Sequence, residues 1–204
     1  MATTPRVRGL VPVLAPLAAL VLCASAARRI TDSTYLVLRP KFVRPCEGEP
    51  DNAMKSVDVT SEMRGRTTVV FHANMTFTRT ADKWHKGYCA VEKCDQTVSA
   101  ATCKFYRPIE TPEICSYMMN PAMPWFKIVD SVQPKLSCPI AKGTYKLSNG
   151  TVSMDLVSAA SGTLRLEGPI WRGRCHIVNS RGVLQFCIDA ATDLFRVRKR
   201  PKPS

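Results

Sequence analysis

Cysteine is the residue type with the clearest chemistry in this chain of 204 residues, which holds nine of them. Cys23 lies in an apolar N-terminal stretch, and the other eight are an even number, as four disulfides require. These eight are Cys46, Cys89, Cys94, Cys103, Cys115, Cys138, Cys175 and Cys187. A zinc site is the competing interpretation, but there is no Cys-x-x-Cys pair and the three histidines lack ligand spacing. We therefore predict disulfides, and neither a metal nor another cofactor.

Catalytic motifs do not occur in the sequence. There is no Gly-x-Ser-x-Gly and no phosphate-binding glycine loop. Eight paired cysteines would leave no thiolate nucleophile. The carboxylates are scattered, and Asp189 and Asp193 near the chain end favour a structural or solvated role. The sequence therefore predicts a protein that is not an enzyme.

Residues 1–26 have the three parts of a secretory signal peptide. Arg6 and Arg8 are basic, residues 10–23 are apolar, and Ala24-Ser25-Ala26 supplies small residues for cleavage. A transmembrane anchor is the alternative, but the apolar core is too short to span a bilayer comfortably. The mature chain is expected to be extracellular, with the lysosome as a second destination.

The charge of the chain favours anionic partners. Without residues 1–26 there are 27 basic and 16 acidic residues, a formal charge of +11. Such a balance suits acidic lipid headgroups, sialylated glycans or polyanions, although a simply basic, solvated surface is the alternative. Nucleic acid is not expected as a partner of an exported chain.

Two sequons, beginning at Asn74 and Asn149, predict surface glycosylation. Residues 195–204 form a basic tail that is predicted to be disordered.

Most of the remaining sequence indicates β-structure. Strand-like runs rich in β-branched residues cover residues 35–43, 54–59, 67–78, 84–91, 152–157, 163–166, 170–178 and 183–189. Residues 67–78 alternate apolar and polar, which indicates one buried and one wet face, and residues 84–91 are the expected return partner. Pro40 makes the first run an edge or bent strand. Residues 94–113 are predicted to be a loop, and 114–119 and 124–132 to be short helical turns.

Several motifs in order resemble those of the ganglioside activator proteins, within the ML (lipid-recognition) superfamily, and more loosely the related insect chemosensory proteins. The matching pieces are Cys46-Glu47-Gly48, Trp84 five residues before Cys89, Cys138-Pro139 with Gly143-Thr144-Tyr145, Trp171-Arg172, Asn179-Ser180-Arg181-Gly182 and Cys187-Ile188. The resemblance covers residues 43–194. It departs from the family at Leu136 and Ser137, where a second cysteine is expected, and at Cys175, which has no counterpart.

The resemblance implies an all-β domain over residues 27–194, with one short helical segment. Its fold would be an immunoglobulin-like β-cup or β-sandwich of two antiparallel sheets, stapled by disulfides, that encloses an apolar lipid cavity. Candidate lining residues are Phe71, Met75, Phe77, Met154, Leu156, Leu164 and Leu166. The residues alone favour a filled core, because most apolar stripes are core; the resemblance favours a cavity.

The cavity rim is expected within residues 118–132. This short span holds two prolines together with Met118, Met119, Met123, Trp125 and Phe126. Methionine suits adaptable apolar surfaces and tryptophan suits membrane interfaces. A helix packed on the sheet is the alternative.

The resemblance also implies that Cys46 pairs with Cys187. We further expect Cys115 to pair with Cys138, and Cys89 with Cys94, which leaves Cys103 for Cys175; Cys94 and Cys103 could exchange roles. A hairpin around residues 179–182 would place Cys175 and Cys187 on opposite faces of the sheet, so these two should not bond each other.

Three functions are compatible with these expectations. The first is a secreted lipid-binding protein that presents or transfers a lipid or glycolipid, with transient membrane contact and an enzyme or receptor as partner. The second is an extracellular chemosensory or immune recognition protein for a hydrophobic signal. The third is a cavity-free, disulfide-rich sandwich that binds a protein.

Overall fold

The computed structural model describes residues 34–198, except residues 66, 82–83, 124, 156 and 159–165. One compact unit comprises Leu36–Arg196. The flanking segments Met1–Tyr35 and Val197–Ser204 form a second unit, of which only residues 34–35 and 197–198 are described. The predicted leader and most of the basic tail lie outside the described residues.

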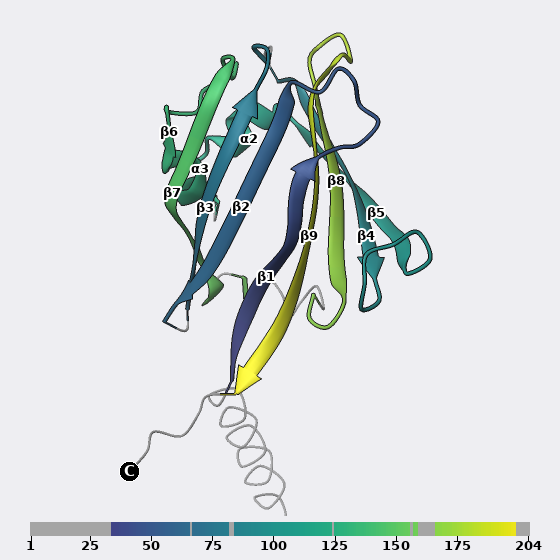
Figure 1. The fold of residues 1–204 in the computed structure, drawn as a ribbon, viewed down its shortest axis with the longest axis vertical. Coiled ribbons are helices and arrows are strands. Elements are labelled where there is room, and N and C mark those ends of the chain that lie inside the picture. Colours follow the sequence, from purple (N-terminus) through teal and green to yellow (C-terminus); the bar gives the residue numbers. More distant parts are fainter. Residues whose placement is uncertain are drawn as a thin grey trace, which may run out of the picture. The chain divides into compact units, whose positions relative to one another are not determined.

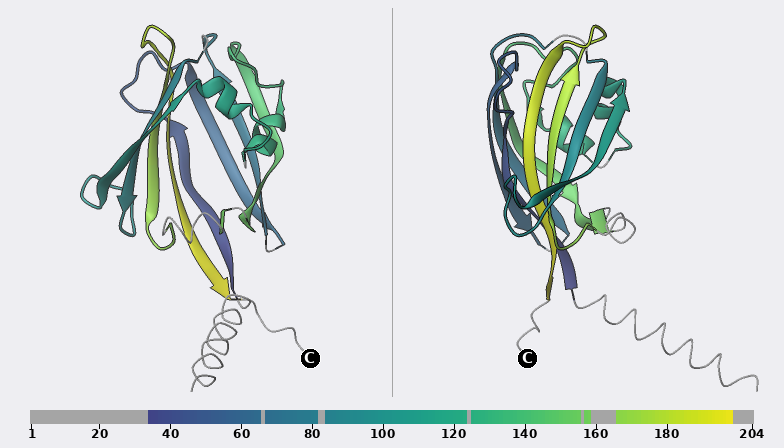
Figure 2. Two further views of the ribbon diagram at one scale, coloured as in Figure 1. Left: turned by 180° about the vertical axis from the view of Figure 1, so that it is seen from behind. Right: turned by 90° about the vertical axis from the view of Figure 1, so that its right-hand side faces the viewer.

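The larger unit consists of two antiparallel sheets that face each other (Figures 1 and 2). The five-stranded sheet has the order β1 (Thr34–Pro45), β9 (Leu184–Arg198), β8 (Ile170–Val178), β4 (Lys86–Cys94), β5 (Cys103–Pro112). The four-stranded sheet has the order β2 (Met54–Arg64), β3 (Thr68–Phe77), β7 (Gly143–Ser153), β6 (Val132–Gln133). Of the two short helices in the described residues, α3 (Phe126–Asp130) lies against β7, and Ile114 of α2 (Ile114–Met118) lies next to Gly87 and Ile177 on β4 and β8. The predicted all-β class with a short helical segment is therefore confirmed.

β3 forms where the alternation of apolar and polar residues predicted a strand. Val69, Ala73 and Phe77 are buried, while Asn74 between them is exposed. β1 is an edge strand, as Pro40 predicts, and β8 has the predicted bounds. The period of two thus located strands wherever one face is buried and the other wet.

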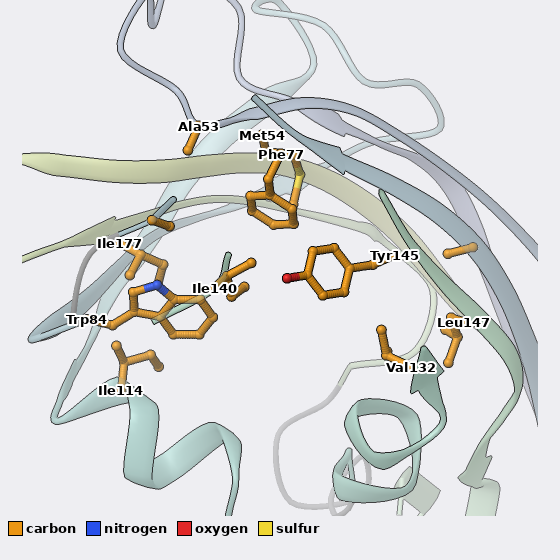
Figure 3. Packing of buried hydrophobic residues seen from close by; sticks show 12 residues of the cluster. Ala53, Met54, Phe77, Trp84, Ile114, Val132, Ile140, Tyr145, Leu147 and Ile177 are labelled. Carbon is orange, nitrogen blue, oxygen red and sulfur yellow. The ribbon is translucent and has the colours of Figure 1, made fainter. Parts of the chain in front are cut away.

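Aromatic side chains fill the space between the sheets at one end. The Phe77 ring lies 5.7 Å from Tyr145 and 5.9 Å from Phe186, which is in turn 4.9 Å from Trp84. Figure 3 shows the labelled side chains of this cluster, among them Phe77, Trp84, Tyr145 and Ile177, pointing toward one another. This part of the sandwich is a filled core, as the residues alone had favoured.

Two predicted strand assignments are wrong. β4 is not the return partner of β3; it lies in the other sheet and pairs with β5 and β8. The predicted strand at 152–157 is the end of β7, which stops at Ser153 and turns helical at Met154. Asn149-Gly150, a dipeptide typical of turns, is instead a bulge inside β7, where Asn149 has φ 58° and a Cβ on Gly150 would lie 2.7 Å from Leu147. The predicted strand at 163–166 lies almost entirely outside the described residues.

The predicted loop at 94–113 contains strand β5. Its residues from Lys104 to Glu110 are all exposed, so no apolar period marks the strand in the sequence. Its partner is β4, with which it forms a hairpin that closes at Cys94 opposite Cys103. The strand therefore owes its place to pairing with β4 and not to burial of one face.

The structure contains four disulfides among the eight cysteines. Cys46–Cys187 and Cys115–Cys138 are the expected pairs. The expected Cys89–Cys94 and Cys103–Cys175 bonds are wrong, because the actual pairs are Cys89–Cys175 and Cys94–Cys103. Each of these joins residues directly opposite each other on neighbouring antiparallel strands, so strand register selects the partner. Cys175 lies opposite Ile188 and Cys187 opposite His176, on alternate faces as predicted.

Candidate functional site

An open-sided cavity of about 380 Å³ lies beside the inner face of the five-stranded sheet. It is lined by Leu38, Pro40, Val43, Phe71, Val91, Trp171, Arg172, Gly173, Cys175, Ala190, Ala191 and Thr192. The side chains of Arg172 and Ala191 nevertheless alternate to the other face of the sheet. Nearly all of the lining residues are apolar, and only Phe71 comes from the four-stranded sheet. The arrangement has the size and lining of a site for an apolar molecule.

Short side chains on three neighbouring strands create this space. Gly173 on β8 pairs with Ala190 on β9 and with Val91 on β4. A Cβ on Gly173 would have one neighbour within 4 Å, the sulfur of Cys175 at 3.8 Å. Around Gly173 and Ala190 the inner face therefore has too little side-chain volume to reach the opposite sheet. The cavity follows from this lack of side-chain volume.

The two faces of β9 also differ in burial, and the cavity side is the less buried one. Ile188, Ala190 and Thr192 on the cavity side are only half-buried, whereas Asp189 and Ala191 on the opposite side are buried. In an ordinary sandwich the face toward the second sheet is the more buried one. Here the inward face is the more accessible of the two over this stretch.

Trp171 forms one wall of the cavity. Its indole Nε1 donates a hydrogen bond to the Leu166 carbonyl oxygen at 2.8 Å. Its ring meets the Tyr106 ring edge-on, with centroids 5.1 Å apart. The hydrogen bond satisfies the polar atom of the indole, so its apolar surface is free to line the cavity.

An ion-pair cluster supports the sheet on the face opposite the cavity. Arg172 Nε and Nη2 donate to the two Asp189 carboxylate oxygens at 2.8 and 3.0 Å, and Arg44 Nη2 lies 3.3 Å from Asp189 Oδ2. Burial acts to raise the pKa of Asp189, but the hydrogen bonds and charges of Arg172 and Arg44 outweigh it and hold that pKa below its ordinary value. Asp193 has a lowered pKa for the same reason, with Arg39 and Lys41 as partners. These bonds join β1, β8 and β9 behind the cavity.

The predicted lining residues do not gather around this cavity. Phe71 lines it, but Phe77 is buried in the aromatic core and Met75 packs against that core. Met154 and Leu166 pack in a separate cluster with Leu36, Val69 and Leu194. Leu156 and Leu164 lie outside the described residues.

Two of the five predicted rim residues line a different hollow. Met119 and Phe126 line a space of about 330 Å³ next to α3, together with Val129 and Leu136. Met118 packs on the aromatic core, Met123 is half-buried, and the Trp125 ring lies 4.7 Å from Tyr117. None of these side chains lines the 380 Å³ cavity.

Sequence reasoning did not predict Trp171, Gly173, Cys175, Ala190 and Thr192 as lining residues. A signal was present, because the short residues Gly173 and Cys175 on β8, and Ala190 and Thr192 on β9, are two positions apart and so share one face of their strand. Small residues on one face of a paired strand indicate either close approach of another backbone or open space. The sequence does not distinguish these two outcomes.

Other chemistry in the described part of the chain is limited. Cys46 and Cys187 lie near His176, and Cys94 and Cys103 near Glu92, but both cysteine pairs are disulfides and offer no thiolate to a metal. No helix among the described residues is long and apolar enough to cross a membrane.

The sequon asparagines lie on the outer face of the four-stranded sheet. Asn74 on β3 and Asn149 on β7 are both exposed, and the Asn149 backbone N–H donates to His72 Nδ1 at 3.4 Å. Their positions are accessible, and the use of either one as a glycosylation site stays a prediction.

No family model and no curated protein matches the chain. Among solved structures it is similar to chicken MD-1 complexed with lipid IVa, with 14% identity and a TM-score of 0.37 over 78% of this chain and 96% of that one. It is also similar to a protein from Archaeoglobus fulgidus, with 8% identity and a TM-score of 0.24 over 73% and 99% of the two chains. Likeness at this level carries no functional argument, so any function has to rest on the geometry of the chain itself.

Proposed function

We propose that this protein is a secreted lipid-binding protein that takes an acyl chain of a lipid or glycolipid into the cavity of about 380 Å³ between its sheets. It would then present or transfer that lipid. The observation that carries the proposal is the apolar lining of a space that no side chain of the described residues fills. The order of motifs resembling the ganglioside activators supports the same function.

The energetics of burial favour this kind of ligand. Each methylene removed from water contributes about 0.8 kcal/mol, so a chain of ordinary length gains far more in a cavity than on a flat patch. The lining offers few polar groups, so a charged or heavily hydroxylated molecule would lose its hydration without compensation. The ligand would therefore place its apolar part inside and its polar part at the opening.

The cavity volume also bears on the alternative function. A space of about 380 Å³ lies at the lower end of the range for ligand sites, which is roughly 300–1,000 Å³. It suits one acyl chain, or one small hydrophobic signal, better than several chains. An extracellular recognition protein for such a signal is therefore the second candidate, and both functions include transient contact with a membrane, an enzyme or a receptor.

Native mass spectrometry of the secreted protein tests the proposal. A bound species whose mass matches a lipid, released on denaturation, is the expected result. Delipidated protein should also extract lipid from mixed vesicles. Protein that carries no apolar ligand and extracts none would overturn the proposal.

A matched pair of variants localises the ligand. Ala190→Leu places a larger side chain in the cavity, whereas Ala90→Leu makes the same change on β4, where Ala90 lies opposite Arg174 on the other face of the sheet. Both alanines are half-buried. We expect the first variant to carry less lipid and the second to match the unmodified protein, and equal lipid content in both would place the ligand elsewhere.

A further inference from the structure

The edge strand β5 exposes three large apolar side chains to solvent. Phe105, Tyr106 and Ile109 are 63%, 50% and 43% exposed, respectively. They belong to a strand that is open to solvent on both faces from Lys104 to Glu110. Several large apolar residues exposed on one strand are typical of an interaction surface.

Basic residues occupy the cavity-side face of the same hairpin. Lys93 on β4 lies directly opposite Lys104 on β5, and Arg107 lies opposite Val91. Like charges placed directly across a strand pair destabilise the sheet. Among the described residues no ion pair involves Lys93, Lys104 or Arg107, which we call the basic flank. An anionic partner would relieve the repulsion within it.

The basic flank is continuous with the lipid cavity. Val91 lines the cavity and is two residues before Lys93, so both point to the same face of β4. Ile109 lies opposite Cys89, whose disulfide partner Cys175 also lines the cavity. Tyr106 packs edge-on against the cavity wall residue Trp171. An apolar path bordered by cations therefore leads from the cavity to the edge of the sheet.

From these positions we propose that the β4–β5 hairpin docks on the surface of an anionic lipid bilayer, with Tyr106 and Ile109 in the interface and the basic flank against the headgroups. The proposal deepens the lipid-binding function above and rests on it. Aromatic and aliphatic side chains among lysines and arginines are the composition of interfacial membrane contacts. Pro108 and Pro112 lack an N–H and so hinder the addition of a protein strand along this edge, which makes a bilayer the favoured partner.

Flotation with vesicles tests the docking surface. The full mature chain is incubated with phosphatidylcholine vesicles and with vesicles containing phosphatidylserine, at low and at physiological salt. We expect binding to the anionic vesicles, weakened by salt. The triple variant Lys93→Gln/Lys104→Gln/Arg107→Gln should bind them on the order of 100-fold more weakly, since each cation near an anionic surface contributes about fivefold.

A triple variant on β2, on β7 and just before β7 serves as a charge-matched control. Lys55→Gln/Lys142→Gln/Lys146→Gln removes the same net charge from exposed positions away from the hairpin. It should bind anionic vesicles nearly as well as the unmodified protein. Equal loss in both triple variants would mean that total charge, and not the hairpin, governs binding, and would overturn the proposal.

The two proposals fail separately. The flank variant leaves the cavity lining unchanged, so its lipid content by native mass spectrometry should equal that of the unmodified protein. If the protein carries lipid but does not bind anionic vesicles, membrane docking is overturned while the lipid-binding function stands. That result would favour a protein partner for β5. Protein that carries and extracts no lipid overturns the function itself, whatever its vesicle binding.

Discussion

Replacement of Gly173 by leucine should raise the free energy of unfolding and weaken lipid binding. Gly173 lies in the middle of β8 and faces the cavity, and a Cβ there would contact only the Cys175 sulfur at the ordinary distance of 3.8 Å. Its φ is not in the left-handed region, so a larger residue meets no backbone strain. The leucine side chain should enter the cavity and remain there.

The expected magnitudes have opposite signs for folding and binding. Glycine within a strand costs about 0.5–1 kcal/mol relative to alanine, and burial of a leucine side chain contributes about 1.5–3 kcal/mol. Because the new side chain fills existing space only in part, we expect the delipidated variant to gain about 1–3 kcal/mol in its free energy of unfolding. The same four carbons displace about four methylenes of a bound chain, which weakens lipid binding by about 3 kcal/mol, on the order of 100-fold.

Urea denaturation of the delipidated protein measures the first quantity, and titration with a fluorescent single-chain fatty acid measures the second. Gly173→Ala is the matched control, because its added methyl group should raise stability slightly and keep binding within a few-fold. A leucine variant that loses about 1–3 kcal/mol, as overpacked cores do, and binds fatty acid normally would refute the reasoning. It would show that side chains already fill the space.

The remaining predictions concern charge, disulfides and the region between the helices. Asp189→Asn should cost about 2–3 kcal/mol, less than a fully buried pair because Arg44 reaches solvent. Since its folded pKa is lowered, the stabilisation from Asp189 is complete above its unfolded pKa of about 3.9 and is lost as the pH falls through the lower folded pKa, so the variant should lose less stability than the unmodified protein over this acid range. Peptide mapping under non-reducing conditions should recover a Cys89–Cys175 cross-link, and removing both cysteines should cost about 4–5 kcal/mol by the chain-entropy model; a Cys89–Cys94 peptide would contradict the strand register. Alanine at Trp125 and Phe126 should lower the melting temperature more than it weakens vesicle binding, because Trp125 packs on Tyr117 and Phe126 lines the hollow beside α3, away from the hairpin; a loss of vesicle binding at unchanged melting temperature would instead make them a membrane-contacting rim.

The sequence predicted those strands whose side chains carry a local signal. β3 was located by its alternation of apolar and polar residues, and β8 by a strand-length run rich in β-branched residues. β5 was not, because an edge strand exposed on both faces has no such period and its prolines indicate a loop. Its existence depends on hydrogen bonds to β4, which are formed by the backbone and leave little trace in side-chain type.

The disulfide errors follow from the same limitation. Cys89 and Cys94 are close in the sequence, but both lie on the extended strand β4, where their side chains point to opposite faces. Their true partners are set by the register of β4 against β8 and β5, a long-range property. The pair Cys46–Cys187 was correctly expected because a resemblance between whole sequences supplied the long-range information that spacing lacks.

The cavity itself shows why its lining was the hardest feature to predict. A search for large apolar residues finds the side chains that fill space, and Phe77 is indeed 2% exposed within the aromatic core. A cavity arises where volume is missing, at Gly173, Ala190 and Thr192, which in isolation resemble ordinary strand residues. Their effect depends on which residues of the second sheet lie across from them, and among the described residues of that sheet only Phe71 lines the cavity. The apolar wall provided by Leu38, Val91 and Trp171 then turns the missing volume into a site for an apolar ligand.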